Sequence, residues 1–333
     1  MRVGIIGAGL QARRRAPVLL DSPDTKLVVI SAAHPEPAKR LAEEMGCEAD
    51  VGWERIVNRN DIDTIIVCTP PHIHAAVSIA AIKSGKHVLC EKPLTRTLAE
   101  AEEMVKVAQK CNVTLKCGFN HRHHPGIQKV RQWLDKGLLG KPLVVRCRYG
   151  IGGRPGYEKE WRANPEVVGG GQLMEQGIHG IDLARWFLGE FSEASGIVET
   201  IYWPIKPLED NAFAIYRTKS GGMAFIHSSL TQWKNLFSFE LYGTEGYAAV
   251  EGLGGGYGNE RAILAKKDFF APFQEETTEF RGDDRSWREE WKEFVTSVRE
   301  CRDPVGSGKD GLEAMRLVMA VYQAAKTGQM VKL

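Results

Sequence analysis

The sequence predicts an α/β protein with two domains: a doubly wound parallel sheet in residues 1–120, then a second α/β domain with a mostly antiparallel sheet in residues 121–333. Three observations lead to this prediction. The chain has 333 residues, more than one ordinary domain usually contains. In its first part, short apolar runs alternate with amphipathic helical segments, as in parallel sheets covered on both faces. After about residue 122, apolar runs follow one another with only turn residues between them, which is typical of antiparallel strands.

The first domain is expected to contain five recognisable strands and four helices. The run 64–68, for example, is continuously apolar after its first threonine, as a strand buried on both faces should be. Strands are expected at Arg2–Ile6, Lys26–Ala32, Thr64–Cys68, His87–Cys90 and Thr114–Cys117, and helices at Leu10–Leu20, Pro35–Met45, His74–Lys83 and Leu98–Lys110. In such a sheet the ligand crevice lies at the carboxyl ends of the strands.

The second domain is expected to begin with a helix and end with one. A strand and a glycine-rich irregular stretch should follow the first helix, and a further helix precedes a series of closely spaced strands. The helices are expected near 126–136, after 171 and at 310–326, and the strands at 143–149, 194–202, 212–218, 223–231, 237–242 and 247–251. The last helix carries an apolar stripe and should pack back on the protein.

Composition excludes several classes of partner. A net charge of +2 gives no strong field for nucleic acid or for an acidic membrane surface. The seven cysteines form no CxxC pair and no metal-ligand spacing, so we expect reduced thiols and a cytoplasmic protein. No apolar stretch approaches the length that spans a bilayer.

A glycine-rich turn joins the first strand to the first helix. Gly7 permits the tight turn, Gly9 lets the backbone approach a pyrophosphate, and Ala12 allows close helix–strand packing. The intervening Leu10 and Gln11 stand at the helix N-terminus, whose N–H groups can hold phosphate. The turn therefore predicts a bound dinucleotide.

The end of the second strand favours neither NAD nor NADP. The pattern expects a carboxylate there for the ribose 2′-hydroxyl, but the chain has Ala32 and Ala33. Nothing repels a 2′-phosphate, and no Arg stands beside these alanines to attract one. His34, Lys39 or Arg13 could attract it weakly.

Two further segments follow later strands at the same sheet edge. Thr69 and Pro70, with His74, are placed to line the passage for ribose and nicotinamide, although prolines are also ordinary at helix starts. Lys92, between Glu91 and Pro93, can donate a hydrogen bond to a substrate oxygen and stabilise alkoxide character. A surface lysine before a proline is the alternative interpretation.

A polar stripe marks the helix after the glycine loop 169–171. Glu175, His179 and Asp182 are spaced i, i+4, i+7 and share one face, while apolar residues occupy the opposite face. The imidazole suits proton transfer with a secondary hydroxyl, and the first carboxylate can orient it. A solvated polar face is the alternative.

The run from His121 to His124 has the residue types of a metal site but not its spacing, because adjacent residues before a proline do not converge on one ion. Arg122 is better interpreted as a contact to substrate or cofactor. Trp161 and Arg162 in the glycine-rich connection could stack on and hydrogen-bond the nicotinamide, or the tryptophan could fill an inter-domain seam.

These motifs, in this order, resemble the Gfo/Idh/MocA oxidoreductase family over nearly the whole chain. The segments 118–122, 169–182 and 308–314 add to the likeness. The resemblance implies an NAD(P)-binding Rossmann domain, a substrate domain with an open sheet used for homodimer or homotetramer contacts, and oxidation or reduction at a secondary carbon of a sugar, cyclitol or nucleotide sugar.

The resemblance also implies roles for single residues. Lys92 and His179 would carry catalysis and Glu175 would assist, Arg122 and Asp182 would approach substrate, and cofactor contacts would come from Gly7, Gly9, Leu10, Gln11, Ala12, Ala32, Ala33, Thr69, Pro70, His74, Glu91, Lys92, Asn120, Trp161 and Arg162. The chain departs from the family pattern at Glu175, where an Asp is usual, and at Ala32, where the ribose-binding acid is usual.

Two other functions are compatible with the same fold. A glycosidase that oxidises its substrate transiently on bound NAD would turn over without net NADH. A non-catalytic nucleotide sensor would not need both Lys92 and His179, so the presence of both disfavours it.

Overall fold

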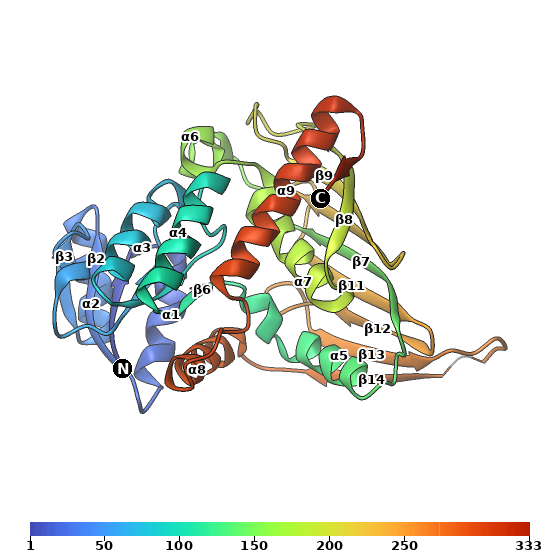
Figure 1. Cartoon of the computed structure of the whole chain (residues 1–333), viewed down its shortest axis with the longest axis horizontal. Helices are drawn as coiled ribbons and strands as arrows, with labels where there is room; N and C mark the ends of the chain where they lie inside the picture. The colour runs from blue at the N-terminus through green and yellow to red at the C-terminus, as the bar shows by residue number, and fades with distance from the viewer. Residues whose placement is uncertain (273) are drawn as a thin grey trace. The chain divides into compact units, whose positions relative to one another are not determined.

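The computed structural model describes residues 1–272 and 274–333, which form two compact units (Figure 1). The first unit comprises residues 1–120, 166–169 and 287–313. The second unit comprises residues 121–165, 170–286 and 314–333. None of the helices in the described ranges is long and apolar enough to cross a membrane.

The first unit is built on a six-stranded parallel sheet in the order β3-β2-β1-β4-β5-β6. The chain runs outward from β1 in both directions, so the predicted doubly wound sheet is confirmed. The strands are β1 (Arg2–Ile6), β2 (Lys26–Ala32), β3 (Glu48–Val51), β4 (Thr64–Val67), β5 (His87–Cys90) and β6 (Leu115–Cys117), and the helices are α1 (Leu10–Leu20), α2 (Pro35–Met45), α3 (His74–Lys83) and α4 (Leu98–Cys111).

Local sequence explains where several of these helices begin and end. Thr97 and Glu100 form a capping box at the start of α4, each side chain bonding the other's backbone N–H. Helix α2 ends at Gly46 in the left-handed conformation, with φ of 66°. Strand β3 was not predicted from the sequence because it has only four residues, is largely exposed and lacks the apolar run of the other strands.

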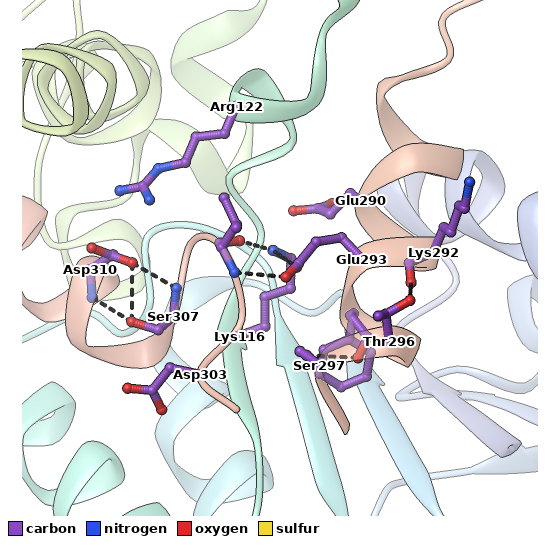
Figure 2. A network of polar contacts seen from close by, with 12 residues as sticks. Lys116, Arg122, Glu290, Lys292, Glu293, Thr296, Ser297, Asp303, Ser307 and Asp310 are labelled. Atoms are coloured by element: carbon purple, nitrogen blue, oxygen red, sulfur yellow. Dashed lines mark hydrogen bonds and ion pairs between the residues drawn. The ribbon is translucent and has the colours of Figure 1, made fainter. Parts of the chain in front are cut away.

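A segment from the C-terminal part of the chain completes the first unit. In helix α8 (Ser286–Arg299), Trp291 and Phe294 are buried in the same apolar cluster as Ile30 of β2. Figure 2 shows the polar contacts nearby, where the fully buried Lys116 of β6 pairs with Glu293 at 3.3 Å and donates to the Val305 carbonyl. This return of the chain to the first unit was not predicted from the sequence.

The second unit is built on a nine-stranded sheet in the order β14-β13-β12-β11-β7-β10-β9-β8-β15. Within the described residues, β7 and β10 are the one parallel pair of this sheet and the other neighbours are antiparallel, so the mostly antiparallel open sheet is confirmed. The strands are β7 (Pro142–Gly150), β8 (Phe191–Glu199), β9 (Asn211–Thr218), β10 (Met223–Ser229), β11 (Leu236–Gly243), β12 (Gly246–Glu251), β13 (Glu260–Lys266), β14 (Glu275–Phe280) and β15 (Val331–Lys332). The last three were not among the expected strands.

The remaining helices are α5 (Pro125–Asp135), α6 (Pro165–Val168), α7 (Ile178–Leu188) and α9 (Gly308–Thr327), and a π-helical turn at Leu173–Gly177 leads directly into α7. Helix α7 lies close against the second sheet. A Cβ on Gly180 would stand 3.0 Å from the Cys147 sulfur and 3.2 Å from Ile226, and one on Gly177 would stand 3.0 Å from Ser228. Glycine at these two positions therefore allows the helix to approach β7 and β10.

Candidate active site

The glycine turn has the shape and the open donors that a pyrophosphate needs. Gly7 has φ of +105°, and a Cβ there would lie 2.6 Å from the Cys68 carbonyl, so only glycine is accommodated. A Cβ on Gly9 would meet no atom within 4 Å. Among the described residues no side chain caps the N-terminus of α1, and its first turn holds no acid. The residues present fit a dinucleotide phosphate.

Three polar side-chain atoms at this end of the first sheet support that fit. Gln11 Oε1, Ser31 Oγ and Thr69 Oγ1 are buried and lack a hydrogen-bond partner among the described residues. Buried polar atoms in proteins are normally satisfied, which favours a polar ligand here. The two alanines that follow Ser31 are half-buried and exposed, in that order, and add no charge.

His74 ties two of the predicted motifs together. Its ring is buried, with Nδ1 3.0 Å from the Pro93 carbonyl oxygen and Nε2 2.7 Å from the Thr69 carbonyl oxygen. Burial lowers the pKa of the imidazole, although both carbonyls act in the opposite direction. The structure therefore places His74 between the backbones of the two loops.

The side chain of Glu91 is turned into the protein by an ion pair. Arg15 donates from Nε to Glu91 at 2.6 Å and from Nη1 to Glu290 of α8 at 2.9 Å. All three side chains are buried. Burial raises the pKa of the Glu290 carboxyl, against the lowering effect of Arg15. The half-buried Lys92 follows directly, so the backbone that carries it is anchored from both sides, by Glu91 and by Pro93.

In the second unit, Glu175 lies on the π-helical turn, where Tyr157 and Arg162 both bind it. The Tyr157 hydroxyl donates to it at 3.0 Å, and Arg162 Nε donates to it at 2.9 Å. Trp161, which is 40% exposed, lies 4.4 Å from the Arg162 guanidinium. The predicted residues 161, 162 and 175 are thus brought into one group.

His179 lies one turn further along, on α7, and is 4% exposed. Its ring stacks on that of His121, with centroids 3.8 Å apart and planes 20° from parallel. Tyr149 approaches both rings, at 6.2 Å from His179 and 5.1 Å from His121. The alternative of a solvated polar face does not hold, because the imidazole and Asp182 are both buried. His121 was considered only as a metal ligand, and its place in the histidine run was the signal that could have identified it.

Arg122 and Asp182 bind each other in a buried bidentate ion pair, with nitrogen–oxygen distances of 2.6 and 2.8 Å. The Arg122 guanidinium also lies 5.3 Å from the centre of the Trp186 ring. Asn120 is buried in the short 3-10 turn after β6. Across residues 1–272 and 274–333 no group of three His, Cys, Asp or Glu is arranged to hold a metal ion.

Two known protein families match most of the chain. Residues 1–119 match the oxidoreductase family described as "NAD-binding Rossmann fold", and residues 127–249 match the "GFO/IDH/MocA C-terminal domain".

Three curated relatives are 28–35% identical to the chain over the aligned residues. A levoglucosan dehydrogenase of Pseudarthrobacter phenanthrenivorans is 29% identical over 287 residues, 74% of this chain and 72% of the relative. A myo-inositol 2-dehydrogenase of Thermotoga maritima is 28% identical over 356 residues, 100% of this chain and 98% of the relative. A dTDP-3,4-didehydro-2,6-dideoxy-alpha-D-glucose 3-reductase of Streptomyces antibioticus is 35% identical over 199 residues, 60% of each chain.

Solved structures share the fold over the whole length. A levoglucosan dehydrogenase in complex with NADH superposes with a TM-score of 0.90 at 24% identity, covering 100% of this chain and 98% of the other. An aldose-aldose oxidoreductase from Caulobacter crescentus superposes with a TM-score of 0.88 at 24% identity, covering 100% and 99%. Together with the two family matches, these findings show that the chain belongs to the Gfo/Idh/MocA family of oxidoreductases and has an NAD-binding Rossmann domain.

Proposed function

We propose that the protein is an NAD(P)-dependent dehydrogenase or reductase that acts on a secondary hydroxyl or ketone of a sugar, cyclitol or nucleotide sugar. The names of the relatives, which include levoglucosan, inositol and dTDP-sugar enzymes, support this substrate class. When bound, the nicotinamide supplies or accepts a hydride at its C4 position. The chain's own residues bind the cofactor, hold the substrate oxygen and move its proton.

The first unit provides the cofactor grip and one cation. The backbone N–H groups of Leu10, Gln11 and Ala12 hold the pyrophosphate at the helix N-terminus, with room made by Gly7 and Gly9. Ala32 and Ala33 lie where the ribose 2′-hydroxyl is expected, and Thr69 and Pro70 line the passage for ribose and nicotinamide. His74 and Glu91 hold these strand ends in place. Lys92 donates to the substrate oxygen and stabilises negative charge on it.

The second unit provides the proton-transfer group. His179 accepts the hydroxyl proton during oxidation and returns it during reduction, while the stacked His121 fixes the plane of its ring. Glu175 holds Arg162, and with it Trp161, in one group for contact with the nicotinamide. Asn120 adds a cofactor contact. Arg122 and Asp182 support the substrate pocket as a fixed pair, because each already binds the other.

The observation that carries this proposal is the support given to each reactive group. Lys92 stands between two anchored residues, and His179 is buried against an aromatic ring on a helix seated by two glycines. Catalytic groups need support of this kind from the residues around them.

The experiment is a coupled screen. Purified protein is titrated with NAD and with NADP, and each is then offered with inositols, monosaccharides, anhydrosugars and nucleotide sugars while absorbance at the reduced-nicotinamide band is followed. Net production or consumption of reduced cofactor with at least one of these substrates is expected. Release of a leaving group without net reduced cofactor would identify the glycosidase alternative and overturn the proposal.

We also propose that the protein assembles as a homodimer or homotetramer through the second sheet. Ile197 on β8, Phe213 and Ile215 on β9, and Met223 on β10 are exposed by 65, 39, 48 and 46%. A face of this kind favours contact with a second copy. Light scattering on the double variant Phe213→Ser, Ile215→Lys should report a smaller particle than the wild type, and an unchanged mass would refute this use of the face.

A further inference from the structure

An aromatic cluster stands at one edge of the second sheet. Tyr202 and Trp233 are exposed by 62 and 64% and meet edge to face, with centroids 4.9 Å apart. Trp203 lies beneath Tyr202, at 5.2 Å and 82°. We call these three residues the aromatic platform. Clustered aromatic rings that are exposed to solvent often mark a binding site.

The backbone beneath the platform is held rigidly by one buried carboxylate. Asp210, which is fully buried, accepts hydrogen bonds from the backbone N–H groups of Ile201, Tyr202 and Trp203 at 2.9, 2.8 and 2.8 Å. Three consecutive amides on one carboxylate fix the turn. Burial acts against the charge, but these bonds prevail, and the pKa of Asp210 is lowered. The indole N–H of Trp203 is also fixed, donating to the Leu230 carbonyl at 3.0 Å.

Trp233 is held in an unusual backbone conformation. Its φ is +55°, in the left-handed region that bulky residues seldom occupy. Such outliers persist where the surroundings enforce them, and they gather at ligand sites. The glycine-rich loop after β7 packs against the Trp203 ring and the Trp233 backbone. A Cβ on Gly153 would lie 2.5 Å from the Trp203 indole, and one on Gly152 would lie 3.3 Å from the Trp233 backbone.

The platform lies at the same end of the second sheet as the π-helical turn that carries Glu175 and leads into α7, which carries His179. Strands β7 and β10 are parallel, and β8 runs with them because both β8 and β10 pair antiparallel with β9. The segments that follow these three strands therefore meet at one edge. A series of contacts continues inward: Trp203 lies 6.5 Å from the Tyr157 ring, and the Tyr157 hydroxyl donates to Glu175.

We propose that the aromatic platform is a subsite for a second pyranose ring, so that the substrate is a glycoside or short oligosaccharide rather than a lone monosaccharide. The inference rests on the proposed function. The apolar C–H face of a pyranose packs well on Trp and Tyr rings. A backbone that is already fixed loses little conformational entropy when a ligand binds, and the turn held by Asp210 is fixed in this way.

The first test compares substrates of different length. The ratio of kcat/KM for a disaccharide or an aryl glycoside to that for the matching free monosaccharide should fall about five- to tenfold in Trp233→Ala, the loss expected for one aromatic contact. Tyr202→Ala, which leaves the backbone at 233 untouched, should lower the ratio in the same direction. Phe270→Ala removes a ring that is 80% exposed on the β13–β14 turn and serves as the matched control with an unchanged ratio.

The second test measures binding without turnover. Quenching of tryptophan fluorescence by disaccharides should be present in the wild type and in Phe270→Ala and absent from Trp233→Ala. If no sugar is oxidised but this quenching is found, the proposed function fails and the subsite stands. If sugars are oxidised and the substrate ratio and the quenching are unchanged in Trp233→Ala, the subsite is refuted. A lower oligomeric mass of Trp233→Ala with unchanged sugar binding would assign the platform to self-association instead.

Discussion

Replacing His74 should weaken the first unit and disturb the loop that carries Lys92. The ring is 1% exposed and lies against two backbone carbonyl oxygens, of Thr69 and Pro93. His74→Ala removes the donor to one of them, at a cost of about 1–3 kcal/mol, and leaves a cavity that costs about 1–2 kcal/mol more. We expect the free energy of unfolding to fall by about 3 kcal/mol. His74→Gln retains an amide donor and should lose about half as much.

The same substitution should change how stability depends on pH. A neutral imidazole donates one hydrogen bond, whereas an imidazolium would donate to both carbonyls, but burial prevails and the pKa of His74 lies below its usual 6.5. Because the pKa of His74 is lower in the folded state, the unfolded state binds a proton first as the pH falls. The contribution of His74 to the free energy of unfolding is therefore complete above pH 6.5 and is lost as the pH falls toward the folded-state pKa. The stability difference between the wild type and His74→Gln should therefore shrink between pH 7 and pH 5.

Urea unfolding, followed by far-UV circular dichroism at pH 7, 6 and 5, measures both effects. Asn58→Ala, at an exposed side-chain hydrogen bond in the same unit, provides a mild control. The reasoning fails if His74→Ala unfolds at the wild-type urea concentration. It also fails if the wild type gains stability over His74→Gln on acidification, because the imidazolium would then be the buried form.

Three further outcomes follow from single contacts. Gly7→Ala places a Cβ 2.6 Å from the Cys68 carbonyl in a left-handed turn, and should abolish NADH binding in fluorescence titration while the second sheet stays folded. Glu209→Ala leaves the N–H groups of Gly171 and Leu173 without the carboxylate that accepts from them at 3.0 and 2.9 Å, and thermal unfolding should show a loss of about 2–3 kcal/mol. His121→Ala removes the ring that stacks on that of His179 at 3.8 Å, and turnover with the substrate identified in the screen should fall because the plane of the proton-transfer group is no longer fixed.

Much of the first unit could be predicted because its signals are local. The bounds of β1, α1, β2, α2 and α3 agree with those expected from sequence, since an apolar run, a glycine turn or a proline marks each end. The short, exposed β3 and the amphipathic α8 carry no such signal. Whether α8 packs on the first unit depends on Trp291 and Phe294 meeting a sheet built from residues far away in the chain.

The predictions for the candidate site also succeeded where the signal is local and failed where it depends on tertiary structure. The sequence pattern identified 175, 179 and 182 as sharing a helix face, but not that a π-helical turn would separate the first from the other two. Arg122 and Asp182 were predicted to be separate substrate contacts. In the structure they bind each other, although they lie 60 positions apart in the chain. Pairings of this kind depend on tertiary structure, and helix periodicity carries no information about them.

The central claim is that Lys92 and His179 act in one hydride-transfer reaction. The most direct measurement is single-turnover formation of reduced cofactor by Lys92→Met and His179→Gln, with the substrate identified in the screen and with cofactor affinity measured alongside. We predict that each variant binds NADH within about threefold of the wild type, and that the hydride-transfer rate falls by about 10²–10⁴. Transfer at the wild-type rate in both variants would contradict the account.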